Sequence, residues 1–268
     1  MKFPLSRTGQ IRISSSSLSL YESCPYAWKL QYKDKVVTPT RTNPFAAFGI
    51  AIHSVIQGWY QRQVFTRADL ISCWKDVFEK TFNDPDVEEV DTSLRIYLYN
   101  KGVPMLNVFF NRQRLDGLIV SAFGVETPFE IPWQSPYGLV HITGRIDLYI
   151  NGPEGVEIID FKTGKNPQTQ EQVDQDAQLT FYSMAYRYFR RLDPVKYLQL
   201  ERWVTLHYLA TDLRIKSVRG KQHYESLLAR ITKMLQGVDE NNFVACPSAE
   251  NCKYCDLGTY KICKAIEL

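Results

Sequence analysis

Apolar residues recur at helical spacing along the first part of the chain. The 3.6-residue period marks helices at 45–63, 67–82 and about 93–114, each with one apolar face. A run of serines at 14–17 offers N-caps for a shorter helix that follows them. The pattern therefore predicts a helical N-terminal region.

From about residue 118 the pattern changes to short β-rich runs bounded by turn residues. The predicted strands are 118–125, 129–133, 139–150, 155–162, 200–210 and 213–218. Helical periodicity returns at about 173–191 and 222–237. This order of elements predicts an α/β core that follows a helical elaboration.

Composition limits the class of protein without deciding it. The 268 residues are 44% hydrophobic, which is enough for one large core or two small ones. A net charge of +3 is compatible with a nucleic-acid partner. No apolar run approaches the roughly 18 residues that cross a bilayer, and the N-terminus lacks the apolar core of a signal peptide. We therefore expect a cytoplasmic protein with no membrane partner, in which disulfides are not favoured.

Three charged residues lie within two strongly apolar strands. Asp147 is in the first, and Asp160 and Lys162 are in the second. Residues two apart in a strand share a face, so Asp160 and Lys162 project together. A divalent metal beside a reacting phosphate would offset the cost of burying two carboxylates. The alternative is a solvated Asp–Lys pair, which is common and contributes little.

Two further positions could join such a site. Gln178 and Tyr182 share a helix face and could orient a lysine, a water or a phosphate. His53 lies just off an apolar helix face, where a packing role is the alternative to metal binding. Each of these signals is weak when taken alone.

Cysteines are unevenly placed along the chain. Four of the six lie in the last 23 residues, which in a reducing compartment suggests a metal or a cluster. Cys73, beside Trp74 in an amphipathic helix, is expected to be a packing residue.

Together these residues resemble the PD-(D/E)XK nuclease superfamily in its RecB-like branch. The chain is similar to CRISPR-associated RecB-type iron–sulfur exonucleases and to the nuclease domain of AddB-type helicase–nucleases. The family order is a helix-borne His, Gly-x-x-Asp, Asp/Glu-x-Lys with Thr-Gly after it, and Gln-x-x-x-Tyr. Its counterparts here are His53, Gly144 to Asp147, Asp160 to Lys162 with Thr163-Gly164, and Gln178 to Tyr182.

The resemblance implies an α/β, restriction-endonuclease-like fold, with a central mixed sheet flanked by helices. It implies a helical N-terminal region at 1–115 that contributes Cys24 and His53. A nuclease core at 116–240 and a Cys-rich, cluster-binding tail at 241–268 would follow.

Roles for individual residues follow from the same resemblance. The metal ligands would be His53, Asp147, Asp160 and the Phe161 carbonyl, with Mg²⁺ or Mn²⁺ bound. Lys162 would be catalytic, with support from Gln178 and Tyr182. An acidic residue before the Gly-x-x-Asp strand often joins the site in this family, and Glu126 is the better candidate, with Glu130 second.

Iron–sulfur members of the branch use one cysteine before the core and three after it. Cys24 matches the first, and Cys252, Cys255 and Cys263 match the others. Four thiolates suit a 4Fe–4S cluster, although they also suit zinc. Seven residues separate the last two cysteines, more than the family commonly has, so Cys246 remains an alternative last ligand.

The residues predict a metal-dependent DNA nuclease. The resemblance further implies an exonuclease that acts at single-stranded ends, in DNA repair, recombination or CRISPR adaptation. One alternative is a non-catalytic or weakly catalytic DNA-processing subunit within a helicase or integrase complex; another is a zinc-binding structural module. The chain carries no helicase P-loop, so any helicase would be a separate protein.

Basic and aromatic residues of the C-terminal half could hold DNA. The candidates are Arg187, Tyr188, Arg190, Arg191, Lys196, Arg214, Lys216, Arg219 and Lys221. For Arg190 and Arg191 a solvated helix end is an equal alternative.

Overall fold

The computed structural model describes residues 11–36, 41–62, 66–115, 122–152, 155–194, 196, 200–253, 255, 257 and 263. The chain divides into two compact units, each assembled from separate stretches of sequence. The first unit comprises Met1–Thr40, Pro128–Gly144 and Gly220–Leu268, and the second comprises Arg41–Thr127 and Arg145–Arg219. The consecutive division expected at residues 115 and 240 is a different partition, and it stays a prediction.

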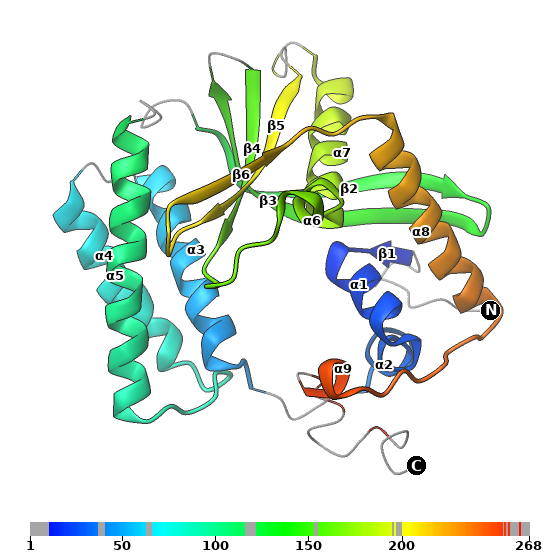
Figure 1. Cartoon of the computed structure of the whole chain (residues 1–268), viewed down its shortest axis with the longest axis horizontal. Helices are drawn as coiled ribbons and strands as arrows, with labels where there is room; N and C mark the ends of the chain where they lie inside the picture. Colours follow the sequence, from blue (N-terminus) through cyan, green and yellow to red (C-terminus); the bar gives the residue numbers. More distant parts are fainter. Residues whose placement is uncertain are drawn as a thin grey trace. The chain divides into compact units, whose positions relative to one another are not determined.

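The second unit contains the long helices α3, α4, α5 and α7 and most of the sheet (Figure 1). Its helices are α3 (Pro44–Arg62), α4 (Arg67–Phe82), α5 (Thr92–Leu115), α6 (Gln170–Asp174) and α7 (Ala177–Leu192). Its strands are β4 (Gly155–Lys162), β5 (Glu201–Tyr208) and β6 (Leu213–Ser217), with the start of β2 (Ala122–Ser135) and the end of β3 (Gly138–Gly152).

The first unit contains the remaining parts of β2 and β3 and several shorter elements. These are β1 (Ile11–Ile13), α1 (Ser15–Ser23), α2 (Pro25–Trp28), a short π-helix (Lys29–Lys33), α8 (Lys221–Asp239) and α9 (Ala249–Lys253). Ser14 caps α1 by accepting a hydrogen bond from the Ser17 amide, as the serine run predicts. No described helix is both long and apolar enough to span a bilayer.

The strands form a mixed six-stranded sheet in the order β1-β3-β4-β5-β6, with β2 also paired to β3. β4 runs antiparallel to β3 and parallel to β5. All but its two end residues are buried, as expected of a strand covered on both faces. This sheet with its flanking helices confirms the predicted α/β, restriction-endonuclease-like fold class.

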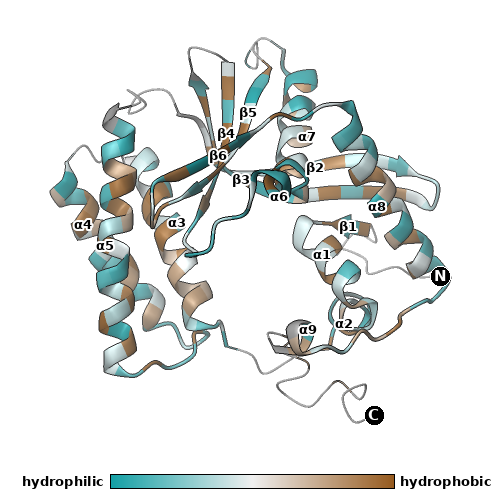
Figure 2. Ribbon diagram, viewed as in Figure 1, coloured by the Kyte–Doolittle hydropathy of each residue, from teal (hydrophilic) through white to brown (hydrophobic). Residues whose placement is uncertain are grey.

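Aromatic packing joins the long helices of the second unit to the sheet. Trp74 of α4 lies edge-on to Phe48 of α3 and stacks on Tyr99 of α5. Only glycine fits at position 102 of α5, because a Cβ there would lie 2.3 Å from the Trp74 ring. Phe161 of β4 belongs to the same buried cluster, which therefore fixes α3 against the strand. Figure 2 shows the hydrophobic bands on α3 and α5 that this packing requires.

Two predicted elements differ from the structure. The single helix expected at 173–191 is two helices, because Asp176 accepts a hydrogen bond from the Leu179 amide and caps α7. The two strands expected at 118–125 and 129–133 form one strand, β2, and residues 116–121 lie outside the described residues.

Candidate active site

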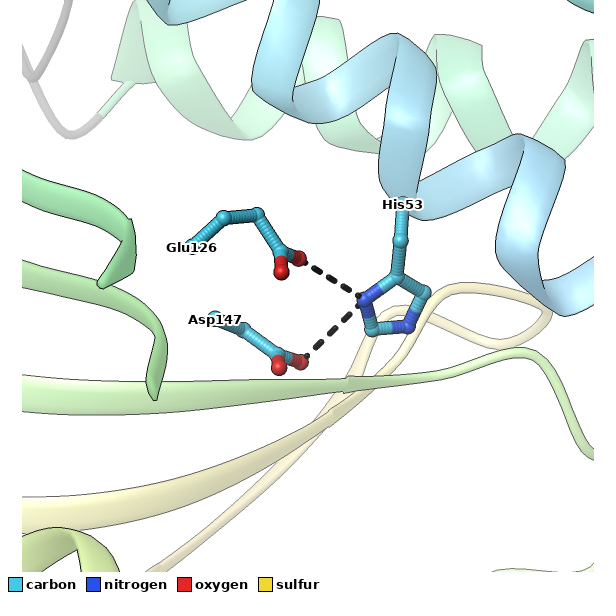
Figure 3. A group of neighbouring side chains, drawn as sticks. All are labelled: His53, Glu126 and Asp147. Atoms are coloured by element: carbon cyan, nitrogen blue, oxygen red, sulfur yellow. Dashed lines mark ion pairs between the residues drawn. The ribbon is translucent and has the colours of Figure 1, made fainter. Parts of the chain in front are cut away.

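One imidazole and two carboxylates meet in the second unit (Figure 3). His53 comes from α3, Glu126 from β2 and Asp147 from β3, and their ligand atoms all lie within 4.8 Å of one another. His53 Nδ1 is 3.5 Å from Glu126 Oε1 and 3.4 Å from Asp147 Oδ2. Among the described residues this is the one His, Cys, Asp and Glu group with metal-binding spacing. Its oxygen and imidazole donors fit Mg²⁺ or Mn²⁺.

His53 is oriented by the backbone of β4. Its Nε2 lies 3.1 Å from the Phe161 carbonyl oxygen, which can only accept, so Nε2 carries the proton. Nδ1 is thereby left facing the two acids, which is the outer-shell arrangement that orients ligating histidines. This structure gives the Phe161 carbonyl an orienting contact with His53, and its role as a metal ligand stays a prediction.

Crowded charge shifts the pKa values of this group. Burial would lower the pKa of His53, but its hydrogen bond with Glu126 and the charges of Asp147, Asp160 and Glu126 raise it to about 9. Burial, together with the charge of Asp160, raises the pKa of Asp147 to about 7, against the opposing effects of His53 and the Phe161 amide. A bound cation would offset this excess of negative charge.

Asp147 and Asp160 lie where the ladder between β3 and β4 stops. The first pair of the ladder is Gly152 with Gly155, and the last is Leu148 with Ile159. Asp147 and Asp160 are the next residues beyond that last pair. There the Asp147 carboxylate accepts the Phe161 amide at 3.0 Å. Both aspartates are nearly inaccessible, with 8% and 2% of their surfaces exposed. The acids are therefore fixed by the sheet itself.

Lys162 and Asp160 project together, as the strand period requires. Lys162 Nζ lies 2.8 Å from Asp160 Oδ2 and donates to Gln178 Oε1 at 3.0 Å. Gln178 Nε2 donates to the Tyr182 hydroxyl at 2.9 Å. That hydroxyl donates to Asp160 Oδ1 at 3.3 Å and lies 3.5 Å from Asp147 Oδ1. A directed chain of hydrogen bonds therefore links the lysine to both acids.

The residues linked by these hydrogen bonds set one another's charge states. Burial would lower the pKa of Lys162, but the Asp160 carboxylate beside it raises the pKa above its ordinary value. Burial, and then the charges of Asp160 and Asp147, raise the pKa of Tyr182. Lys162 therefore stays cationic and Tyr182 stays a neutral donor at neutral pH.

Glu126 adopts a backbone conformation that non-glycine residues rarely occupy. Its φ is +44°, in the left-handed region, and strain of this kind gathers at functional sites. Arg145 donates to the Glu126 carbonyl at 3.3 Å. Glu130, the second candidate, instead lies in the first unit, where it pairs with Arg12 and His141.

A pocket of about 360 Å³ opens beside the group of three. Its wall is formed by one face of α3 together with the two acids: Gly49, Ile50, His53, Ser54, Gln57, Glu126 and Asp147. Gly49 lies one turn before His53, and a Cβ on it would be 3.5 Å from Thr163 Oγ1, at the end of β4. The sequence argument overlooked Ser54 and Gln57, although the i+4 spacing of Gln57 from His53 could have indicated that residue.

The candidate cluster cysteines lie in the first unit. Cys24, Cys255 and Cys263 pack around one small apolar group, formed by Ala27, Leu30 and Leu257. The Cys246 amide donates to Cys24 Sγ at 3.4 Å. Even so, the cysteines within the described ranges form no group of three at metal-ligand spacing. Cys73 is buried in the second unit, as predicted for a packing residue.

Three of the arginines that could hold DNA make contacts within the second unit, and a role for them in DNA binding stays a prediction. Arg187 pairs with the buried Glu201, and Arg214 donates to Glu157 at 2.7 Å. Arg219 is only 3% exposed and donates to backbone carbonyls. Buried carboxylates need cationic partners, and Arg187 and Arg214 supply them for Glu201 and Glu157.

Comparison with known proteins agrees with this geometry. A sequence model of the PD-(D/E)XK nuclease superfamily matches residues 12–263, so the chain belongs to that superfamily. A solved structure named "Crystal structure of SSO0001" is similar over 95% of this chain and 86% of that chain. Its identity is 14% and its TM-score is 0.39, too low to support a functional argument. Among curated proteins, no significant match is found.

The family establishes a nuclease, for which a divalent metal and a DNA substrate are usual. Seven residues stand in one contact network within the second unit: His53, Glu126, Asp147, Asp160, Lys162, Gln178 and Tyr182. The family match does not specify the branch of the superfamily, the exonuclease type or the iron–sulfur cluster, and these stay predictions.

Proposed function

We propose that the protein is a Mg²⁺- or Mn²⁺-dependent DNA exonuclease that acts at single-stranded ends. The observation that carries the proposal is the contact network itself. A cationic Lys162 is held 2.8 Å from Asp160, and Tyr182 joins that carboxylate to Asp147 of the His53–Glu126–Asp147 group. A solvated Asp–Lys pair would not need such burial or such a directed network.

His53, Glu126 and Asp147 would hold the cation, and Asp160 could complete its coordination. When bound, the metal would supply a Lewis acid that activates water and offsets phosphate charge. Lys162 would place positive charge where negative charge grows on the phosphate during attack. Gln178 and Tyr182 keep the lysine and the acids at fixed separations, so that little reorganisation is needed during the reaction.

We further propose that Cys24, Cys252, Cys255 and either Cys263 or Cys246 bind a 4Fe–4S cluster, with zinc as the alternative. Support comes from the three cysteines that pack around one apolar group and from the amide that donates to Cys24 Sγ. Apolar surroundings and amide hydrogen bonds to sulfur are usual around such clusters, where they set the reduction potential. Visible absorbance of the purified protein would separate iron–sulfur from zinc.

The decisive assay uses end-labelled single-stranded and duplex DNA with Mg²⁺ or Mn²⁺. We expect Lys162→Ala to lower the cleavage rate by about 10²–10³-fold, because a preorganised charge is lost from the transition state. Lys75→Ala, on the exposed face of α4, is the matched control and should cleave normally. Circular single-stranded DNA should resist the wild-type enzyme if it needs an end.

Equal cleavage by wild type and Lys162→Ala would sink the proposed mechanism. A wild-type protein that binds DNA but does not cleave it would favour the alternative of a non-catalytic DNA-processing subunit. Addition of a helicase or integrase partner that restores cleavage would instead place the enzyme within the recombination or CRISPR-adaptation complexes considered above.

A further inference from the structure

A second group of cationic and aromatic side chains lies in the second unit outside the catalytic network. Lys101 Nζ stands 4.8 Å from the ring centroid of Phe48, and Lys165 Nζ stands 5.9 Å from that of Tyr97. Tyr97 is 45% exposed, and its neighbour Ile96 is 56% exposed. Tyr97 and Lys101 are four residues apart on α5, so they share a helix face.

These lysines have no acidic partner to account for their position. Within the described part of the chain, neither the half-buried Lys101 nor the exposed Lys165 forms an ion pair, whereas Arg112, Lys162, Arg187 and Arg214 of the second unit do. Burial lowers the pKa of Lys101; Tyr97 opposes this shift and the charge of Lys165 adds to it. Two like charges brought together beside an exposed ring indicate an anionic ligand that carries a flat group.

The group adjoins the catalytic residues through two short connections. Phe48, under Lys101, immediately precedes Gly49, which lies one turn from His53 and against Thr163. Lys165 is three residues after Lys162, just beyond the end of β4. Both connections run within the second unit, so the group lies beside the proposed reaction centre.

We propose that Tyr97, Lys101 and Lys165 form a platform for the DNA single strand next to the bond that is cut. Tyr97 stacks on an unpaired base, and the two ammonium groups pair with neighbouring phosphates. Aromatic rings and basic groups in this combination bind single strands because every base has a stacking face and every linkage has a charge. The inference rests on the proposed function, since it names how that site takes its substrate.

The test is binding of a fluorescent oligothymidylate by anisotropy, with EDTA present so that the strand is not cut. Tyr97→Ala should weaken binding about tenfold, whereas Tyr97→Phe, which keeps the ring, should bind like the wild type. Lys101→Gln and Lys165→Gln should each reduce the slope of log K against log salt by about 0.7. Lys75→Ala, a lysine removed from another helix of the same unit, should leave the slope unchanged.

A blunt DNA duplex provides the discriminating ligand. Its bases are already stacked, so Tyr97→Ala should leave duplex affinity unchanged. Equal losses on duplex and single strand, or wild-type single-strand affinity in Tyr97→Ala, would overturn the platform. Melting temperatures within about 2 °C of the wild type show that the variants are folded.

The two proposals fail in different ways. If the wild type cleaves DNA and Lys162→Ala does not, the nuclease mechanism stands whatever Tyr97→Ala does. If the wild type cleaves DNA but the platform variants bind normally, only the platform is wrong. A wild type that neither binds nor cleaves single-stranded DNA overturns both.

Discussion

The acidic site of the second unit and the cysteines of the first unit differ in what positions their side chains. His53, Glu126 and Asp147 project from a long helix and two paired strands, and their ligand atoms are already gathered. The C-terminal cysteines follow α8 in a segment whose described regular structure is limited to the short helix α9, and no three cysteines of the described ranges bring their sulfurs to metal-ligand spacing. A ladder of backbone hydrogen bonds can place carboxylates without a metal, whereas thiols on such a segment depend on the bound group to bring them together.

The largest effect is expected when two glutamates of β2, one inside the metal-ligand group and one outside it, are substituted in turn. Glu126→Gln should weaken Mn²⁺ binding about 10–100-fold, because it removes one charge from the gathered ligands. Glu130→Gln changes the same chemical group four residues away, where the partners are Arg12 and His141, and should leave Mn²⁺ affinity unchanged. Calorimetric titration of both variants measures the difference; equal affinities would show that the gathered group is not the metal site.

Removal of the Tyr182 hydroxyl tests whether the acids are held by their network. Tyr182→Phe keeps the ring but loses the donor to Asp160 and the acceptor for Gln178. We expect the cleavage rate to fall about tenfold, as for other groups that orient metal ligands. Tyr186→Phe, on the same helix, is the control. An unchanged rate in Tyr182→Phe would mean that the strands alone fix the carboxylates.

A cysteine variant tests the opposite region. If the proposed cluster is bound, Cys252→Ala should lose its visible absorbance and melt about 5 °C lower, because a bound group stabilises the segments that it joins. Cys73→Ala should keep the absorbance, because this thiol packs against apolar residues in the second unit. A Cys252→Ala protein with the wild-type melting temperature would count against a structural cluster.

The smallest expected effect is a pH dependence of folding carried by His207. Burial lowers the pKa of this imidazole, against the opposing hydrogen bond with Asp212. Below about pH 6.5 the unfolded chain binds a proton that the folded ring resists, so stability falls as the pH drops. In His207→Gln the decline between pH 7 and pH 5 should be shallower. Denaturant unfolding at several pH values measures this slope, and parallel curves for the two proteins would contradict the assignment.

Local patterns were sufficient to predict most of the elements. The period of apolar residues predicted α4 from Arg67 to Phe82 and β4 from Gly155 to Lys162 with the observed bounds. It failed between α6 and α7, where a polar cap at Asp176 interrupts an otherwise continuous helical pattern. Apolar periodicity reports burial, and it does not register the side-chain hydrogen bond that ends one helix and begins the next.

The same division applies to the catalytic residues. The sequence by itself determined that Asp160 and Lys162 share a strand face and that Gln178 and Tyr182 share a helix face, because these relations follow from fixed local periods. Only the tertiary structure decided that Glu126 joins His53 and Asp147, that Arg187 and Arg214 pair with buried acids, and that Arg219 is buried. Those outcomes depend on which distant strands pair, on the left-handed backbone at Glu126 and on the need of buried acids for partners, and no local period encodes any of these.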